Sequence, residues 1–254
     1  MIMQFDVISS GSKGNATLIF SHGHCIQIDF GISKKRISKA IENYEKSFDD
    51  IEAFFITHSH SDHASDVQNA PKEKIYFGNP ALSKVQGVIS GERLLRPFVP
   101  IQISVFTVTP IPLSHDAKNT LGFVVNDGEE SLAYITDTGF VPEKVFPYLK
   151  NLDYYIFESN HDPKMLYESK RPDYLIRRII SDTGHLSNTD CGYYLSMLLG
   201  DKTKEIILAH LSDECNTPEL ARKTLEEVFQ RQLGFLPEVL IKTASDKTET
   251  RGGR

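Results

Sequence analysis

The sequence predicts an α/β protein in four layers, an α+β arrangement with two β-sheets packed together and helices outside. Apolar runs of strand length alternate with segments that carry apolar residues at helical spacing. Both halves of the chain show this alternation of strand-like and helical segments, without a sequence repeat. Two sheets packed on each other with helices outside require such an alternation. Polar residues that can bind metals directly follow several of the strand-like runs. Strand ends are where α/β folds gather ligands.

The first half reads as short strands and turns, followed by alternating helices and strands. Ile37, Ala40, Ile41 and Tyr44 have the spacing of a helix that buries one face. Alternating apolar residues bounded by Gly, Ser and Asn predict the strands. The expected strands are 3–8, 16–20, 25–29, 51–57, 75–77 and a region within 98–112; the loop is 9–15, the turn 22–24, and the helices 33–44, 62–69 and 80–86.

The second half continues the same alternation. The expected strands are 120–126, 131–136, 154–158, 205–209 and an edge strand at 239–243, and the expected helices are 142–149, 171–180, 188–199 and 217–231. No linker of Pro, Gly and Ser divides the chain, so we expect one domain over residues 1–247. Residues 248–254 are expected to fray as a flexible tail.

Composition excludes several classes of protein. With 40% hydrophobic and 24% charged residues, the chain is an ordinary globular protein. No apolar run approaches the roughly 20 residues that span a bilayer, and no signal-peptide pattern opens the chain, so we expect a cytoplasmic protein without a membrane partner. Three cysteines (Cys25, Cys191 and Cys215) suggest neither a disulfide framework nor a four-thiolate zinc site. A net charge of -6 does not favour bulk electrostatic coating of nucleic acid.

The strongest functional signal is a cluster of three histidines and one aspartate directly after an apolar run. In an extended backbone, His58 and His60 project to the same side. Asp62 stands where a helix could begin, as a capping carboxylate, and His63 beside it could face a second ion. Solvated loop histidines and a simple Asp-His cap are the alternatives, but the spacing favours a metal site.

Three further residues share one context, because each ends a strand-like run: His115, Asp137 and His210. An ordinary buried histidine is the alternative for His115 or His210 alone. Together with the cluster, they supply ligands for two ions. His58, His60 and His115 would bind one ion, and Asp62, His63 and His210 would bind the other. The carboxylate of Asp137 would bridge the two ions. Imidazole and carboxylate ligands suit two divalent ions of zinc, manganese or iron.

These residues resemble the metallo-β-lactamase superfamily, whose signature His-x-His-x-Asp-His stands at residues 58–63, followed by His115, Asp137 and His210. The resemblance covers nearly the whole chain and implies an αββα sandwich with a dinuclear metal site at one edge of the sheets. Narrower segments look like the YycJ/WalJ-type branch of bacterial exonucleases; they are 9–17, 158–162, 184–188 and 209–212.

The resemblance implies a metal-dependent phosphodiesterase, an exonuclease that hydrolyses DNA ends through a metal-bridged hydroxide. Asp62 could orient that nucleophile or accept its proton. His185 is the candidate acid for the leaving oxygen, with a helix-entry residue as the alternative reading. The alternative function is hydrolysis of a small ester, thioester or lactone at the same site, which the negative net charge of the chain would suit better.

Six more residues are candidates for substrate binding or for supporting the ligands. Glu158 could accept a ring N–H from a ligand histidine. The glycine-rich loop at 9–15 could offer backbone N–H groups to a phosphate, or could be an ordinary hairpin connection. His161 could line the pocket or sit in a turn before Pro163. The six are Ser10, Lys13, Asn15, Glu158, His161 and Asn188.

Overall fold

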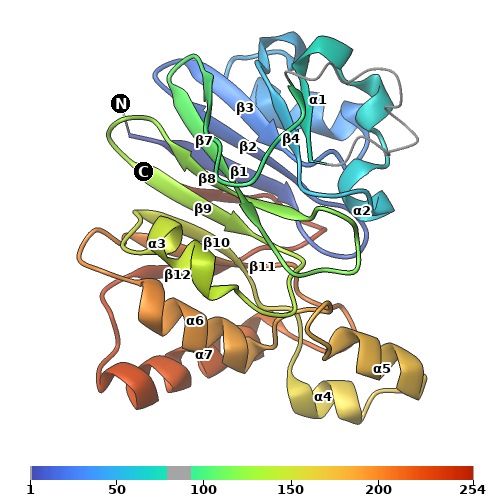
Figure 1. The fold of residues 1–254 in the computed structure, drawn as a ribbon, viewed down its shortest axis with the longest axis vertical. Coiled ribbons are helices and arrows are strands. Elements are labelled where there is room, and N and C mark those ends of the chain that lie inside the picture. Colours follow the sequence, from blue (N-terminus) through green and yellow to red (C-terminus); the bar gives the residue numbers. More distant parts are fainter. Residues whose placement is uncertain (1, 79–92, 254) are drawn as a thin grey trace.

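The computed structural model describes residues 2–78 and 93–253, and two sheets form its centre (Figure 1). Within these residues, the first sheet has six strands in the order β13-β1-β2-β3-β4-β5. Its strands are β1 (Gln4–Ser9), β2 (Ala16–Ser21), β3 (His24–Ile28), β4 (Phe54–Ile56), β5 (Ile75–Phe77) and β13 (Thr250–Gly252).

The second sheet has seven strands in the order β12-β11-β10-β9-β8-β7-β6 within the same described ranges. They are β6 (Ile101–Ile103), β7 (Phe106–Pro112), β8 (Leu121–Asn126), β9 (Ser131–Ile135), β10 (Tyr154–Glu158), β11 (Glu205–Ala209) and β12 (Leu240–Thr243). The helices are α1 (Lys34–Glu42), α2 (Ser61–Ala64), α3 (Phe146–Leu149), α4 (Pro163–Tyr167), α5 (Asp173–Ile179), α6 (Asn188–Leu198) and α7 (Pro218–Leu233).

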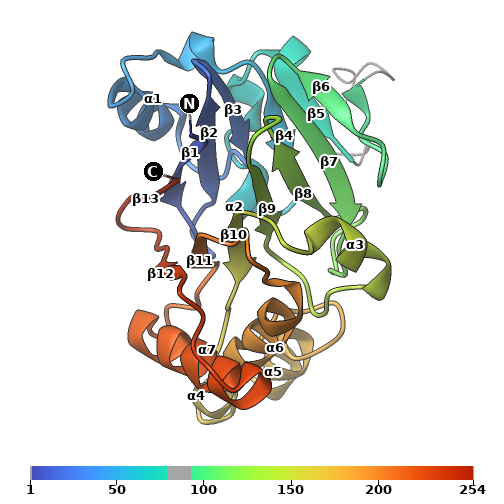
Figure 2. The same cartoon turned by 90° about the vertical axis from the view of Figure 1, so that its left-hand side faces the viewer.

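Alternating side chains along the strands build the predicted four layers. Phe55 of β4 faces the second sheet and packs edge to face on Phe123. Its neighbours Phe54 and Ile56 point the other way, into the cluster that includes Ile37 of α1. The outer face of the second sheet is covered by α3, α6 and α7 (Figures 1 and 2). The predicted four-layer α/β class is confirmed.

Helices α1 and α7 have clear end signals. The Ser33 side chain accepts a hydrogen bond from the backbone N–H of Arg36 and caps α1. Thr217 caps α7 in the same way, and Pro218 occupies its first turn. Gly234 ends α7 with a φ of 80°, in the left-handed region that favours glycine.

Parallel pairing brings several strand ends to one edge. In the second sheet Phe157 pairs with Ile135 on one side and with Leu208 on the other, so β9, β10 and β11 end side by side. In the first sheet Ile28 of β3 lies beside Phe55 of β4. The loops that follow these strands therefore emerge together, and they carry the candidate site.

Several element predictions need correction. The strand region 98–112 is a hairpin of β6 and β7. The expected helix 62–69 divides into α2 and the 3-10 segment Val67–Asn69. Helix α4 was not predicted, although Asp162 caps it. The expected helix 80–86 lies outside the described residues.

The predicted frayed end is wrong for β13, which pairs antiparallel with β1. Arg251 lies opposite Asp6, and its Nε is 3.4 Å from the Asp6 carboxylate. The start of β1 and the end of β13 accordingly lie side by side (Figure 2). That the chain is one domain stays a prediction. The three cysteines are buried and free. None of the described helices combines the length and apolarity needed to cross a bilayer.

Candidate metal centre

The seven residues expected to bind metal converge at the shared strand edge. Asp137 and His210 form one group with Glu158 and His185 in which the potential ligand atoms lie within 4.8 Å of one another. The three such groups made only of the seven residues are His58, His60 and His115; Asp62, His63 and His210; and His58, His63 and Asp137. The first two are the sets that the sequence predicted, and the third places the expected bridging carboxylate between them.

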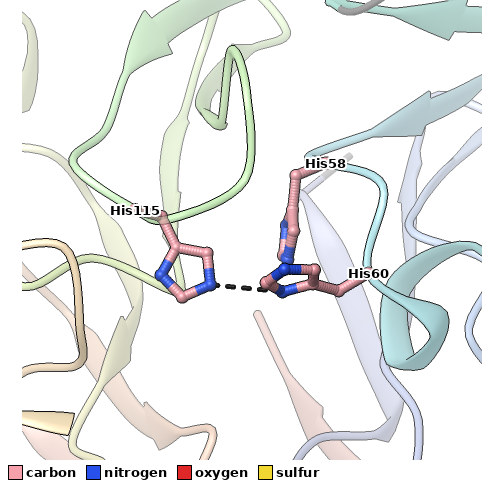
Figure 3. Close-up of side chains that lie close together, drawn as sticks. All are labelled: His58, His60 and His115. Atoms are coloured by element: carbon pink, nitrogen blue, oxygen red, sulfur yellow. Dashed lines mark hydrogen bonds between the residues drawn. The ribbon is translucent and has the colours of Figure 1, made fainter. Parts of the chain in front are cut away.

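The first group comes from two loops that face each other. His58 and His60 follow β4, and His115 follows β7 from the other sheet (Figure 3). His115 Nε2 lies 3.3 Å from His60 Nδ1. The ring centroids of His58 and His115 are 5.1 Å apart. The three imidazoles therefore point at one common volume.

The second group is more deeply buried. His63 Nε2 lies 3.4 Å from Asp62 Oδ2, and His210 Nε2 lies 3.5 Å from the same oxygen. Asp137 reaches both groups, with Oδ2 at 2.8 Å from His63 Nε2 and Oδ1 at 3.7 Å from His115 Nε2. His63 and Asp137 are almost fully inaccessible to solvent.

These separations fit ligands around divalent cations. Atoms that bind one ion at roughly 2 Å in a tetrahedral array lie about 3.4 Å from one another. Moreover, the buried Nε2 of His58 makes no hydrogen bond to any described residue, and a buried polar atom without a partner is costly. A cation between the imidazoles would satisfy it.

The outer ring nitrogens of the histidines are engaged by groups outside the cluster, so the inner nitrogens face the volume that a metal would occupy. His63 Nδ1 donates to Asp29 Oδ2 at 2.7 Å. The Thr57 hydroxyl donates to Asp29 Oδ1 at 2.8 Å and can accept from His58 Nδ1 at 3.1 Å. Partners of this kind fix the tautomer and orientation of metal-binding histidines.

The other three histidines follow the same rule. His115 Nδ1 is 3.1 Å from the carbonyl oxygen of Gly184. His210 Nδ1 is 3.1 Å from Glu158 Oε1. The ring of His60 has the opposite orientation: its Nε2 faces Asp116 Oδ1 at 3.3 Å, and its Nδ1 faces the cluster. Five oriented imidazoles are a strong indication of a metal centre.

Three residues of the site adopt left-handed backbone conformations. Asp29, Asp137 and His210 have φ values of 61°, 59° and 56°, and each follows a strand. This conformation costs a non-glycine residue on the order of 1 kcal/mol or more and persists where the surroundings enforce it. Here it turns side chains at the strand ends toward the cluster.

Electrostatics in the cluster also suit a cation. Burial lowers the pKa of His58 well below its ordinary value, and the neighbouring His63 adds to this effect. Burial acts against protonation of His210, but the carboxylates of Asp137 and Asp62 outweigh it and raise its pKa to about 10. The carboxylates around His210 therefore favour positive charge at the second group, and a bound metal would supply such charge.

A cavity of about 210 Å³ opens beside the cluster. Its lining combines candidate metal ligands with polar and basic side chains from the loops and α5. The polar and basic contributors outside the metal set are Ser12, Asn160, Arg171, Arg178, His185 and Ser212. A substrate held there would touch the metal centre directly.

His185 lies on the wall of this cavity. Its Nδ1 is 2.8 Å from Glu158 Oε1, and its side chain is 19% exposed. The second oxygen of Glu158 accepts the backbone N–H of Thr138 at 2.8 Å. Because both oxygens of Glu158 are engaged, it orients His185 and His210 rather than standing free as a ligand.

Residues of the loop at 9–15 contact residues of the metal cluster. The Ser10 hydroxyl accepts the backbone N–H of His210 at 2.8 Å. The Asn15 amide lies 2.9 Å from His63 Nε2 and 3.2 Å from the Asp62 carbonyl oxygen. Lys13 instead pairs with acidic side chains outside the cavity.

Other predicted residues occupy different positions from those expected. His161 is buried and does not line the cavity. Asn188 bonds to the side chains of Ser159 and Asn216 in the interior. Asp62 does not cap α2, because His60 occupies the cap position and Asp62 lies within the helix.

Two residues that support the site, Asp29 and Asp116, were not predicted from the sequence. Asp29 ends the predicted strand 25–29, so the strand-end argument that selected Asp137 applied to it equally. Asp116 carried no separate signal beyond its place next to His115.

Replacing Asp29 by asparagine should weaken metal binding about 10- to 100-fold, because it removes the acceptor that orients His63. Asparagine tolerates the left-handed backbone, so the loop should keep its conformation. Competition of the protein with a fluorescent chelator measures the change. Unaltered affinity in a folded D29N variant would show that Asp29 does not support the metal.

Comparisons with known proteins agree with this geometry. A family model described as a beta-lactamase superfamily domain matches residues 28–210. The exodeoxyribonuclease YycJ of Bacillus anthracis is 30% identical over 246 residues, covering 92% of this chain and 92% of its own length. The exodeoxyribonuclease WalJ of Streptococcus pneumoniae serotype 2 (strain D39) is 30% identical over 265 residues, covering 97% and 96%.

Among solved structures, the metallo-beta-lactamase fold protein YhfI from Bacillus subtilis has a TM-score of 0.72 with this chain. The sequence identity is 18%, and the match covers 99% of this chain and 100% of the other. At this identity the likeness concerns the fold. It agrees with the two-sheet sandwich described above.

Proposed function

Because the chain belongs to the beta-lactamase superfamily and is a metal-dependent hydrolase, we propose that it is a nuclease that hydrolyses phosphodiester bonds at DNA ends. Both full-length relatives described above are named exodeoxyribonucleases. The proposed cofactors are two divalent cations, of zinc, manganese or iron, held by the seven converging residues. Asp137 would be shared between the two ions.

One observation carries this proposal: a single cavity joins the metal cluster, an imidazole outside the cluster, and arginines. Phosphodiester hydrolysis needs each of these, because the attacking water must be activated, the departing oxygen must receive a proton and the negative charge of the phosphate must be stabilised. A neutral ester would not require the basic side chains.

Two divalent ions at such a site lower the pKa of a bound water and polarise a phosphoryl oxygen. The side chains of the protein would then direct proton transfer. Asp62, which is partly exposed to the cavity, would orient the attacking water and accept its proton. His185, steadied by Glu158, would donate a proton to the leaving 3′ or 5′ oxygen.

Elemental analysis combined with digestion of DNA tests the function. Purified protein should contain close to two divalent ions per chain, and with added Mn²⁺ it should shorten DNA labelled at either end. The label that is released first reports the polarity of digestion. Protein that binds two ions, leaves every nucleic acid intact and cleaves thioesters or lactones would overturn the nuclease assignment.

A further inference from the structure

Two arginines extend the metal cavity toward α5, at the lower right of Figure 1. Arg171 stands just before the helix and Arg178 lies in its last turn. We infer that both bind phosphate oxygens of a nucleic acid strand, so that α5 carries the substrate-binding edge of the site. The inference rests on the proposed function and names the residues that select a charged phosphodiester over a neutral ester.

Arg178 is held in place by one edge of its guanidinium group. Its Nε donates to Asp116 Oδ2 at 2.6 Å. Among the described residues, no hydrogen bond of Arg178 uses its terminal Nη atoms, and the side chain is 52% exposed. A planar guanidinium fixed at one edge presents its remaining N–H groups in the fork that phosphate oxygens accept.

Asp116 connects this arginine to the metal centre. Its other oxygen, Oδ1, lies 3.3 Å from His60 Nε2. An exposed ion pair adds little to stability, so stability does not explain an arginine fixed over the cavity. Asp116 acts as a positioning residue that aligns Arg178 with the volume His60 faces.

Arg171 is anchored in a similar way. Its Nε donates to Glu214 Oε2 at 2.9 Å, and Nη2 lies 3.4 Å from the Ser212 hydroxyl. Its side chain is 24% exposed. Ser212 also lines the cavity, so the remaining N–H groups of Arg171 lie at the same opening.

The helix that carries Arg178 rests on a small apolar cluster of its own. Leu166 of α4, Ile176 and Ile179 of α5, and Cys215 form this cluster. Ile179 also lines the cavity. The support is packed rather than loose, and a packed support lowers the entropy lost when the arginines bind a phosphate.

Arg177 provides a matched control. It has the same charge on the same helix but does not line the cavity. Replacing either Arg177 or Arg178 by methionine therefore changes the bulk charge equally. A difference between the two variants reports a specific contact.

The test measures binding of Mn²⁺-loaded protein to a fluorescein-labelled oligonucleotide whose phosphorothioate linkages resist hydrolysis. R178M should raise Kd about 10- to 100-fold, the loss expected for a hydrogen bond to a charged group. It should also reduce the slope of log Kd against log salt by about one. R177M should stay within about twofold of the wild type.

Because the described side-chain contacts of Arg171 are with Glu214 and Ser212, R171M should repeat the loss without disturbing His60. Metal content and thermal unfolding confirm that each variant is intact. Equal weakening by R177M and R178M, or no weakening by R178M and R171M, overturns the inference. A wild-type protein that binds the oligonucleotide through Arg178 yet never cleaves DNA contradicts the proposed nuclease while supporting the phosphate contact.

Discussion

Replacing His58 by alanine should reduce Mn²⁺-dependent hydrolysis of end-labelled DNA roughly a thousandfold or more, since several kcal/mol of transition-state stabilisation depend on the cations. The Nε2 of His58 is buried and makes no hydrogen bond within the described part of the chain. It lies where an ion would join the rings of His60 and His115. Initial rates at saturating Mn²⁺ measure the effect.

His22→Ala is the matched control, because this histidine lies in a half-buried hairpin turn between β2 and β3 and belongs to none of the groups of candidate ligands among the described residues. It should retain full activity and full metal content. Circular dichroism should show that the H58A variant keeps its secondary structure. If folded H58A cleaves DNA as fast as H22A, the cluster is not the catalytic centre.

Replacing His185 by alanine should lower kcat for DNA about 10²- to 10⁴-fold, the usual contribution of a general acid. KM should change little, because His185 is assigned to the leaving oxygen and not to substrate binding. Its position on the cavity wall and its hydrogen bond to Glu158 support this role.

A substrate with a stable leaving group separates acid catalysis from a structural role. Bis(p-nitrophenyl) phosphate releases a phenolate that departs without a proton, so H185A should hydrolyse it at nearly the wild-type rate. H185N keeps a polar group near Glu158 and should show the same selectivity. An equal loss on both substrates would mean that His185 supports the metal centre instead.

The sequence predicted that the candidate metal ligands converge because several of them share one rule. His115, Asp137 and His210 each follow a strand, and parallel pairing of β9, β10 and β11 brings strand ends to one edge. The alternation of apolar residues likewise predicted two sheets with outer helices. Local patterns carry this information, since each pattern needs only neighbouring residues.

Asp29 could have been selected from the sequence as Asp137 was, because it ends a predicted strand, but the supporting contacts themselves depend on long-range packing. Asp29 contacts His63, which lies in a different element of the fold. No local pattern indicated the left-handed backbone conformation of Asp29. Arg178 meets Asp116 across 62 residues of chain. The strand β13 is polar and short, and it exists because β1 offers a free edge. Such pairings arise only once the fold has formed.

Anomalous X-ray diffraction from crystals soaked in Mn²⁺ can locate the ions at the proposed metal centre. We expect two anomalous peaks per chain, one among His58, His60 and His115 and one among Asp62, His63 and His210, with Asp137 next to both. A single peak elsewhere, or no peak in this cluster at saturating Mn²⁺, would contradict the proposed metal centre.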